Sequence, residues 1–268
     1  MNPIFSSEEL RKIAKAIKEG KTDVDSTTDL GITKTKLRLG KEGFFVNDAE
    51  IKIPKIREGD KSCYIAIDGE LQKILYFSEE TKGIYRLVPT SEKPILQISG
   101  TSMHKMEFVE RIKWDKLKGK ILDSGTGLGY TAIAASETAD EVITIETDNT
   151  VIEMQKLNPY SQKLFENKNI KTQTGDIVDE IKKFKNNEFD FIIFDAGTPR
   201  SSGEFFSLNN YKQAFRVLKK GGKLYHYLPM HQITRGRDFG AEVVSRLKEA
   251  GFQKIERNIK DSYAVAQK

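Results

Sequence analysis

The sequence predicts a doubly wound α/β fold, in which a mostly parallel sheet ends in an antiparallel strand, together with a small β-rich N-terminal module. From about residue 118 onward, short apolar strands alternate with helical patterns, which is typical of βαβ units and a parallel sheet. The last two strand patterns lie too close together for a crossover helix, which predicts a closing hairpin. Residues 23–95 instead contain short strands separated by glycine and Asn-Asp turns.

The 268 residues are enough for one large domain or for one domain with an accessory module. The change of pattern favours the second arrangement, and we expect a division into residues 1–95 and 96–268. The N-terminal module begins with a helix that Ser6 or Ser7 caps, and its apolar residues recur at helical spacing up to Gly20. Its strand candidates are residues 36–39, 49–53, 63–67 and 73–77.

The C-terminal part is expected to supply five parallel strands and then a hairpin. The parallel strands are predicted at Lys120–Asp123, Val142–Glu146, Ile170–Thr174, Phe189–Phe194 and Lys223–Tyr227. Helices are expected near residues 130–137, 150–157, 177–184, 207–219 and 239–250. The hairpin consists of Phe252–Asn258 and Tyr263–Gln267.

Composition excludes several classes of protein. The chain has 44 Lys and Arg against 39 Asp and Glu, and this net charge of +5 permits an anionic partner without requiring one. Its single cysteine, Cys63, excludes an internal disulfide framework and a cysteine-based zinc site, and we expect no metal. No apolar run reaches the length of a membrane span, and the N-terminus does not resemble a signal peptide. We therefore expect a cytoplasmic protein without a membrane partner.

The strongest local signal is the glycine-rich segment Ile121–Gly129, which follows the first parallel strand. Gly125 and Gly127 permit a tight turn and a close approach of the backbone to a ligand, and a helix begins directly after the turn. A dinucleotide fingerprint requires a small residue where this chain has Tyr130. Asp123, two residues before the first glycine, suits a cationic ligand better than a pyrophosphate. A turn of purely structural role is the alternative.

Three further carboxylates follow successive strands of the predicted sheet. Glu146 ends the second strand, where an acidic side chain can accept hydrogen bonds from ribose hydroxyls. Asp176 follows the third strand, where a simple turn is the alternative, and Asp195 closes the apolar fourth strand. Because the carboxyl ends of parallel strands share one edge of a sheet, these residues and Asp123 are expected to lie together.

These residues resemble the motifs of the class I S-adenosylmethionine-dependent methyltransferases, whose fold is Rossmann-like with a reversed last strand. The resemblance covers about residues 95–268 and implies S-adenosylmethionine as the cofactor. Asp123 would then lie near the methionyl end, Glu146 on the ribose and Asp176 on the adenine. Asp195 would be the catalytic residue, which either orients the methionyl ammonium or accepts a proton from the acceptor. The residues that the resemblance assigns to cofactor binding are Asp123, Gly125, Thr126, Gly127, Gly129, Glu146, Asp176 and His104.

Residues 189–207 and 218–227 show a closer resemblance to spermidine-synthase-like proteins, in particular to archaeal predicted methyltransferases. It also includes residues 98–104, which implies that Met103 or His104 lies near the cofactor. Aminopropyltransferases carry an aspartate three positions after the one that matches Asp195, whereas this chain has Thr198. That departure counts against polyamine synthesis. The archaeal proteins usually have Pro-Pro-Arg directly after the aspartate, and this chain has Ala196-Gly197-Thr198.

The methyl acceptor is left open by the sequence. Cys63 lies outside the catalytic part, which disfavours cytosine-C5 chemistry. The loop after Asp195 lacks the aromatic clamp expected of an adenine-N6 enzyme. One of Tyr225, His226 and Tyr227 is a candidate for an acceptor pocket, and Arg235 and Arg237 are candidates for phosphate contacts or for a solvated loop before the next helix. Three functions remain: methyl transfer to RNA or another macromolecule, transfer to a small amine or metabolite, and noncatalytic binding. The oligomeric state is unknown.

Overall fold

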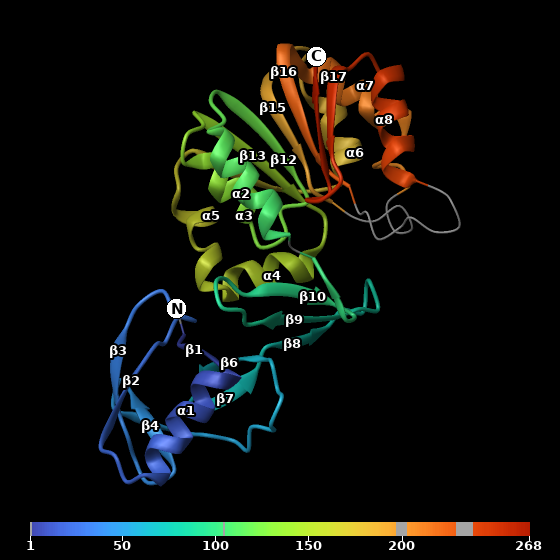
Figure 1. The fold of residues 1–268 in the computed structure, drawn as a ribbon. Coiled ribbons are helices and arrows are strands. Elements are labelled where there is room, and N and C mark those ends of the chain that lie inside the picture. Colours follow the sequence, from blue (N-terminus) through green and yellow to red (C-terminus); the bar gives the residue numbers. More distant parts are fainter. Residues whose placement is uncertain (1, 104, 197–202, 229–237) are drawn as a thin grey trace. The chain divides into compact units, whose positions relative to one another are not determined.

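The computed structural model describes residues 2–103, 105–196, 203–228 and 238–268. The chain forms two compact units (Figure 1). One consists of residues 1–104 and 153–162, and the other of residues 105–152 and 163–268. We call them unit 1 and unit 2. The division expected after residue 95 falls inside the strand Ile95–Ile98. The first segment of unit 1 continues to residue 104.

Unit 2 is built on a seven-stranded sheet with the order β14-β13-β12-β15-β16-β18-β17. The first five strands are parallel, and β18 is antiparallel to both of its neighbours. This confirms the predicted doubly wound sheet with a reversed C-terminal strand. The strands are β12 (Lys120–Ser124), β13 (Glu141–Glu146), β14 (Ile170–Thr174), β15 (Phe189–Phe194), β16 (Leu218–Tyr227), β17 (Gln253–Asn258) and β18 (Tyr263–Gln267).

Helices cover both faces of this sheet, with α2 and α3 on one side and α6, α7 and α8 on the other (Figure 1). The helical segments are α2 (Met106–Asp115), α3 (Tyr130–Ser136), α4 (Asn149–Leu157), η1 (Pro159–Ser161), α5 (Lys163–Glu166), α6 (Ile177–Glu180), η2 (Ile181–Lys183), α7 (Leu208–Val217) and α8 (Phe239–Glu249). By contact, η1 and the second half of α4 belong to unit 1. Asp238 caps α8 by accepting the Ala241 N–H at 3.1 Å.

Unit 2 differs from the sequence prediction in several details, of which the start of β16 and the presence of α2 bear on the site. The helix expected at residues 207–219 ends at Val217, and β16 begins directly at Leu218 rather than at Lys223. The pairing of β15 with β16 is irregular between Phe189 and Phe191, which accommodates the Lys219–Gly222 segment within the strand. Helix α2 was also not predicted. It has no side-chain N-cap, and its first turn follows a lysine.

Unit 1 combines one long helix with short antiparallel strands. Ser6 caps α1 (Ser7–Lys18) by accepting the Glu9 N–H at 3.0 Å, as predicted. The buried face of α1 and the inner strands form a core in which the Phe5 and Phe44 rings are 5.0 Å apart. The strands are β1 (Ile4–Ser6), β2 (Asp23–Ser26), β3 (Thr35–Arg38), β4 (Gly43–Val46), β5 (Ala49–Lys52), β6 (Cys63–Ile67), β7 (Glu70–Lys73), β8 (Leu75–Phe77), β9 (Ile84–Val88), β10 (Ile95–Ile98) and β11 (Thr101–Ser102).

These strands form a three-stranded sheet β1-β6-β7, a four-stranded sheet β11-β10-β9-β8, and the pairs β2-β3 and β4-β5. The predicted segment 73–77 therefore contains the junction between two sheets, because Lys73 ends β7 and Leu75 begins β8. Within the part of the chain that the structure describes, no helix is long and apolar enough to cross a membrane.

Candidate cofactor site

The glycine turn joins β12 to α3 at the carboxyl edge of the unit 2 sheet. The Gly125 and Thr126 N–H groups donate to the Ile145 carbonyl at 3.0 and 3.3 Å, and the Asp195 N–H donates to the Ser124 carbonyl at 3.1 Å. Gly125 has a φ of +71°, and a Cβ there would collide with the Asp195 carbonyl oxygen and with Ala196. The turn therefore lies directly against the ends of β13 and β15, and a side chain at Gly125 cannot be accommodated.

Glu146 fastens this turn to the end of β13. Its Oε2 accepts the Gly127 N–H at 2.9 Å, and its Oε1 accepts the Thr147 and Asp148 N–H groups at 3.0 Å each. Burial raises the pKa of Glu146, although these three backbone donors favour its charged form. The carboxylate is thus held in a fixed orientation beside the glycine turn. The Gly175 N–H donates to the Glu146 carbonyl at 2.9 Å, which places the end of β14 next to it.

Asp123 lies at the centre of the turn and is fully buried. Thr144 donates its hydroxyl to Asp123 Oδ2 at 2.6 Å, and the hydroxyls of Thr126 and Thr144 are 2.6 Å apart. Among the described residues, Asp123 Oδ1 and the neighbouring Ser124 Oγ are buried without a hydrogen-bond partner. Burial raises the pKa of Asp123 to about 6, because hydrogen bonds from the Thr144 and Thr131 side chains offset only part of the lost hydration.

Asp195 follows β15 directly, and only a minor part of its surface is exposed. In the parallel register Ser124 lies beside Phe194, so the next residues, Gly125 and Asp195, are also neighbours. Burial and the charge of Asp123 together raise the pKa of Asp195 to about 8. Two poorly hydrated carboxyl groups, one of which is also raised in pKa by the charge of the other, favour a cation between or beside them.

Asp176 has a second, local role in the structure. It caps α6, since its Oδ1 accepts the Val178 N–H at 2.8 Å, and its side chain is exposed. The cap explains the residue without a ligand, so its contact with adenine remains a prediction. His104, Thr198, Arg235 and Arg237 lie outside the described residues, and Met103 is 36% exposed in unit 1.

The three consecutive residues Tyr225, His226 and Tyr227 have different surroundings. Tyr225 donates its hydroxyl to Asp115 in α2 at 2.7 Å. His226 is fully buried on the opposite face, 2.9 Å from the Tyr211 hydroxyl, and burial lowers its pKa to about 3. Both serve the packing of the sheet.

Tyr227 is the one of these three that lies at the candidate site. Burial and the nearby charges of Asp195 and Glu107 raise the pKa of its phenol to about 12. Glu107, in the first turn of α2, was missed by sequence reasoning because the helix that carries it was not predicted. Thr144 was also missed, although a threonine inside the apolar run Val142–Ile145 is a signal for a buried polar contact.

The residues present fit a ligand that carries both a cation and hydroxyl groups. Asp123 Oδ1 is a buried acceptor that no donor reaches among the described residues. S-Adenosylmethionine carries a sulfonium and an ammonium group, which suit the Asp123–Asp195 pair, and ribose hydroxyls, which suit Glu146.

Comparisons with known proteins agree with this fold. A family model described as "Methyltransferase domain" matches residues 115–261. An uncharacterized protein of the archaeon Methanocaldococcus jannaschii is 38% identical in an alignment 270 positions long, which covers 92% of this chain and 90% of that protein.

Two solved structures are similar in fold. A spermidine synthase in complex with the transition state analogue AdoDATO has a TM-score of 0.58 at 18% identity, over 72% of each chain. The spermidine synthase of Thermotoga maritima has a TM-score of 0.56 at 17% identity, over 72% of this chain and 70% of that one. Since the methyltransferase family model spans more than half of the sequence and the archaeal relative aligns over nearly all of it, the chain belongs to the class I methyltransferase-domain family.

Proposed function

We propose that the protein transfers a methyl group from S-adenosylmethionine to RNA. The observation that carries the cofactor assignment is the pair of carboxyl groups at the glycine turn, Asp123 and Asp195. Burial raises the pKa of both, and the charge of Asp123 raises that of Asp195 further, so a bound cation would favour the charged form of each. Bound S-adenosylmethionine supplies an electrophilic methyl group on its sulfonium sulfur. The protein's task is to align that group with the acceptor in a site that excludes water.

Each residue of the site has a proposed task. Asp123 and Asp195 lie at the methionyl end, and Glu146 accepts the ribose hydroxyls in an orientation that three backbone donors already fix. For Asp195 we favour orientation of the methionyl ammonium over removal of a proton from the acceptor, because its carboxylate ionises most readily beside a cation. Tyr227 keeps its proton at neutral pH, and we assign it to the acceptor side of the site.

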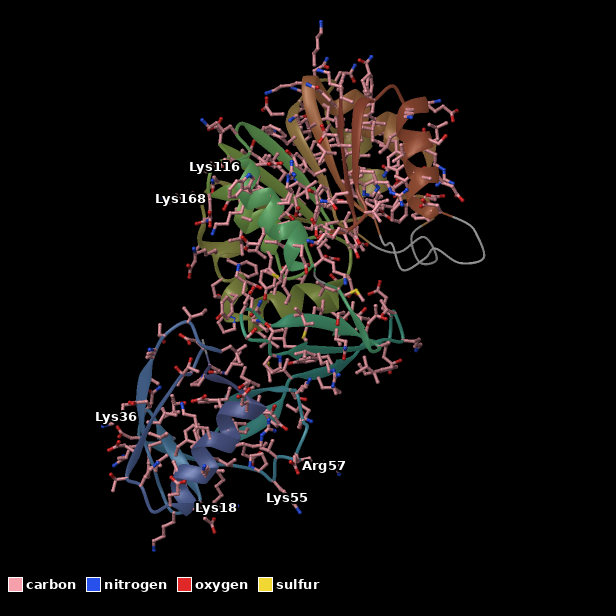
Figure 2. The ribbon with its side chains drawn as sticks, viewed as in Figure 1. Lys18, Lys36, Lys55, Arg57, Lys116 and Lys168 are labelled. Carbon is pink, nitrogen blue, oxygen red and sulfur yellow. The ribbon has the colours of Figure 1, made fainter. Side chains whose placement is uncertain are left out.

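An exposed basic loop in unit 1 supports a polyanionic acceptor. Lys55 and Arg57 extend outward from the loop between β5 and β6 (Figure 2). Arg11 of α1 lies against the same loop, with its guanidinium donating to the Arg57 and Asp60 carbonyls at 3.3 Å each. This loop also carries Glu58 and Asp60. The exposed Lys55 and Arg57, with Arg11 on the helix beside them, are the side chains that suit a phosphate backbone.

Methyl transfer with a labelled methyl group tests this proposal. Total RNA, total protein and a set of small amines are offered separately to the wild type and to the double variant Lys55→Glu/Arg57→Glu. We expect label in RNA, at a rate at least tenfold lower for the variant, while cofactor binding is unchanged. Label in protein, or RNA labelling that the double variant leaves unchanged, contradicts the RNA proposal.

Transfer to a small amine is the second candidate. Glu107 and Asp195 both lie close enough to Tyr227 to raise the pKa of its phenol, so the acceptor side of the site carries negative charge. The similarity in fold to spermidine synthases points the same way. Label in the amines alone selects this candidate. Transfer to none of these acceptors by protein that binds the cofactor contradicts both.

A further inference from the structure

The edge strand β8 carries three consecutive large apolar residues that are exposed. Leu75 is 48%, Tyr76 42% and Phe77 54% exposed. β8 is the last strand of its four-stranded sheet and pairs there with β9. Its other edge has no strand partner within the described residues. An unpaired edge with large apolar side chains favours association with another strand.

Two of these side chains continue into an apolar surface on one face of the sheet. Side chains alternate along a strand, so Leu75 and Phe77 share a face, and Phe77 lies opposite Ile84 of β9. Ile84 is 47% exposed. Tyr76 points to the other face, where it lies opposite the buried Tyr85. Leu75, Phe77 and Ile84 thus form one apolar patch that reaches the free edge of β8.

We propose that this edge is a homodimer interface, in which β8 of one copy pairs antiparallel with β8 of a second copy about a two-fold axis at Tyr76. In that register Leu75 of one copy lies opposite Phe77 of the other, on the same face, and the two apolar patches become continuous. The pairing joins two four-stranded sheets into one and satisfies the free backbone groups of both edges.

The charges that flank β8 favour a second copy in this orientation. Lys73 ends β7, just before the strand; its ammonium group is 2.8 Å from Asp60 Oδ2, and its side chain remains 40% exposed. Glu79 and Glu80 follow the strand. Antiparallel pairing about Tyr76 places Lys73 of one copy at the end that carries Glu79 of the other, whereas parallel pairing would place like charges together. Glu79 is strongly exposed in its contact with Lys82, so it is free to exchange partners. The strand is therefore complementary to itself in both charge and apolar pattern.

Sedimentation velocity over a range of concentrations tests the interface with the full chain. We expect a concentration-dependent dimer for the wild type and at least a tenfold weaker association for Phe77→Asp. The matched control is Ile32→Asp, which changes another half-exposed apolar residue of unit 1 and should leave the dimer intact. A wild type that is monomeric at all concentrations overturns the proposal, and so does a dimer that Phe77→Asp leaves unchanged.

A disulfide tests the register independently of that variant's stability. Residues that face each other directly in an antiparallel pair have Cα atoms about 4.5–5.5 Å apart, a distance that a disulfide spans. Tyr76→Cys should therefore form a covalent dimer under mild oxidation, while Ile32→Cys should not. The native Cys63 is fully buried and should not contribute. Equal crosslinking of the two variants, or none, contradicts the proposed pairing, whereas a stable complex with a different protein would assign the edge to that partner.

Discussion

The carboxyl groups of Asp123 and Asp195 hold their protons more tightly than ordinary aspartates because each lies in poorly hydrated surroundings and Asp195 also lies near a second acid. Neither raised pKa stabilises the folded chain at neutral pH. A bound cation reverses the balance, since it favours the charged form of both groups. The site is therefore coupled to protons, and this coupling has measurable consequences.

Binding of the cationic cofactor should release a proton. In the free protein the pKa of Asp195 is about 8, and the bound cation lowers it, so affinity should rise with pH and level off above pH 8. The rise is at most about tenfold per pH unit for one proton. Calorimetry at pH 7 in buffers of different ionisation enthalpy measures the released proton directly. Asp195→Asn should abolish the release, and a wild type that releases none contradicts the coupling.

The same carboxyl group should lower the stability of the cofactor-free protein. Its folded pKa of about 8 lies above the pKa of an unfolded aspartate. The folded protein therefore has its full stability below about pH 4, where the group is protonated in both states, and loses stability as the pH rises to 8. At pH 8 Asp195→Asn should therefore unfold at a higher denaturant concentration than the wild type, by on the order of 2 kcal/mol. At pH 4 the difference should be close to zero. A destabilised variant at pH 8 contradicts this reading.

Gly125 allows a close approach of two backbone segments that Gly20 does not need. A Cβ at Gly125 would meet the backbone of Asp195 and Ala196, whereas a Cβ at Gly20 would meet no atom within 4 Å. Both have a φ near +70°, so they share the cost of a left-handed conformation. Gly125→Ala should cost at least about 2 kcal/mol and Gly20→Ala about 1 kcal/mol. Urea denaturation measures the loss in free energy of unfolding for each variant. Equal losses would contradict the expected extra penalty of the close approach at Gly125.

At the scale of elements, the alternation of strands and helices in unit 2 was predictable because it rests on apolar periodicity. The ends of elements were not. β16 begins five residues earlier than expected, since Lys219–Gly222 form an irregular stretch of strand that no periodicity reveals. Helix α2 was missed because its position depends on tertiary contacts. Asp115 near its end accepts hydrogen bonds from Arg111 and Tyr225, both at 2.7 Å.

This shared acceptor ties α2 to β16. Tyr225→Phe should destabilise the protein by about 1 kcal/mol, because Asp115 loses one of two donors to the same oxygen. Arg111→Met should cost a similar amount, and the two changes should not be additive. A double-mutant cycle in urea measures the coupling. Strict additivity would show that the two donors act independently.

At the scale of the molecule, the sequence indicated a catalytic fold and an accessory module, and the structure has two units. The strands of unit 1 were harder to predict, since short strands in small sheets have few residues to show a period. The segment 153–162 contacts unit 1 although it lies far along the chain, and no local pattern indicates that. The candidate site was accessible to sequence reasoning because its carboxylates follow consecutive strands. Glu107 of α2 and Tyr227 of β16 come within electrostatic reach of each other only in the folded unit.

Calorimetric titration with S-adenosylmethionine tests the central claim most directly, with decarboxylated S-adenosylmethionine as the matched ligand. We predict that the wild type binds S-adenosylmethionine, that it binds the decarboxylated form no more tightly, and that Glu146→Ala weakens binding at least tenfold. Failure of the folded wild type to bind either ligand would contradict the cofactor site. Preference for the decarboxylated form would contradict methyl transfer and favour aminopropyl transfer.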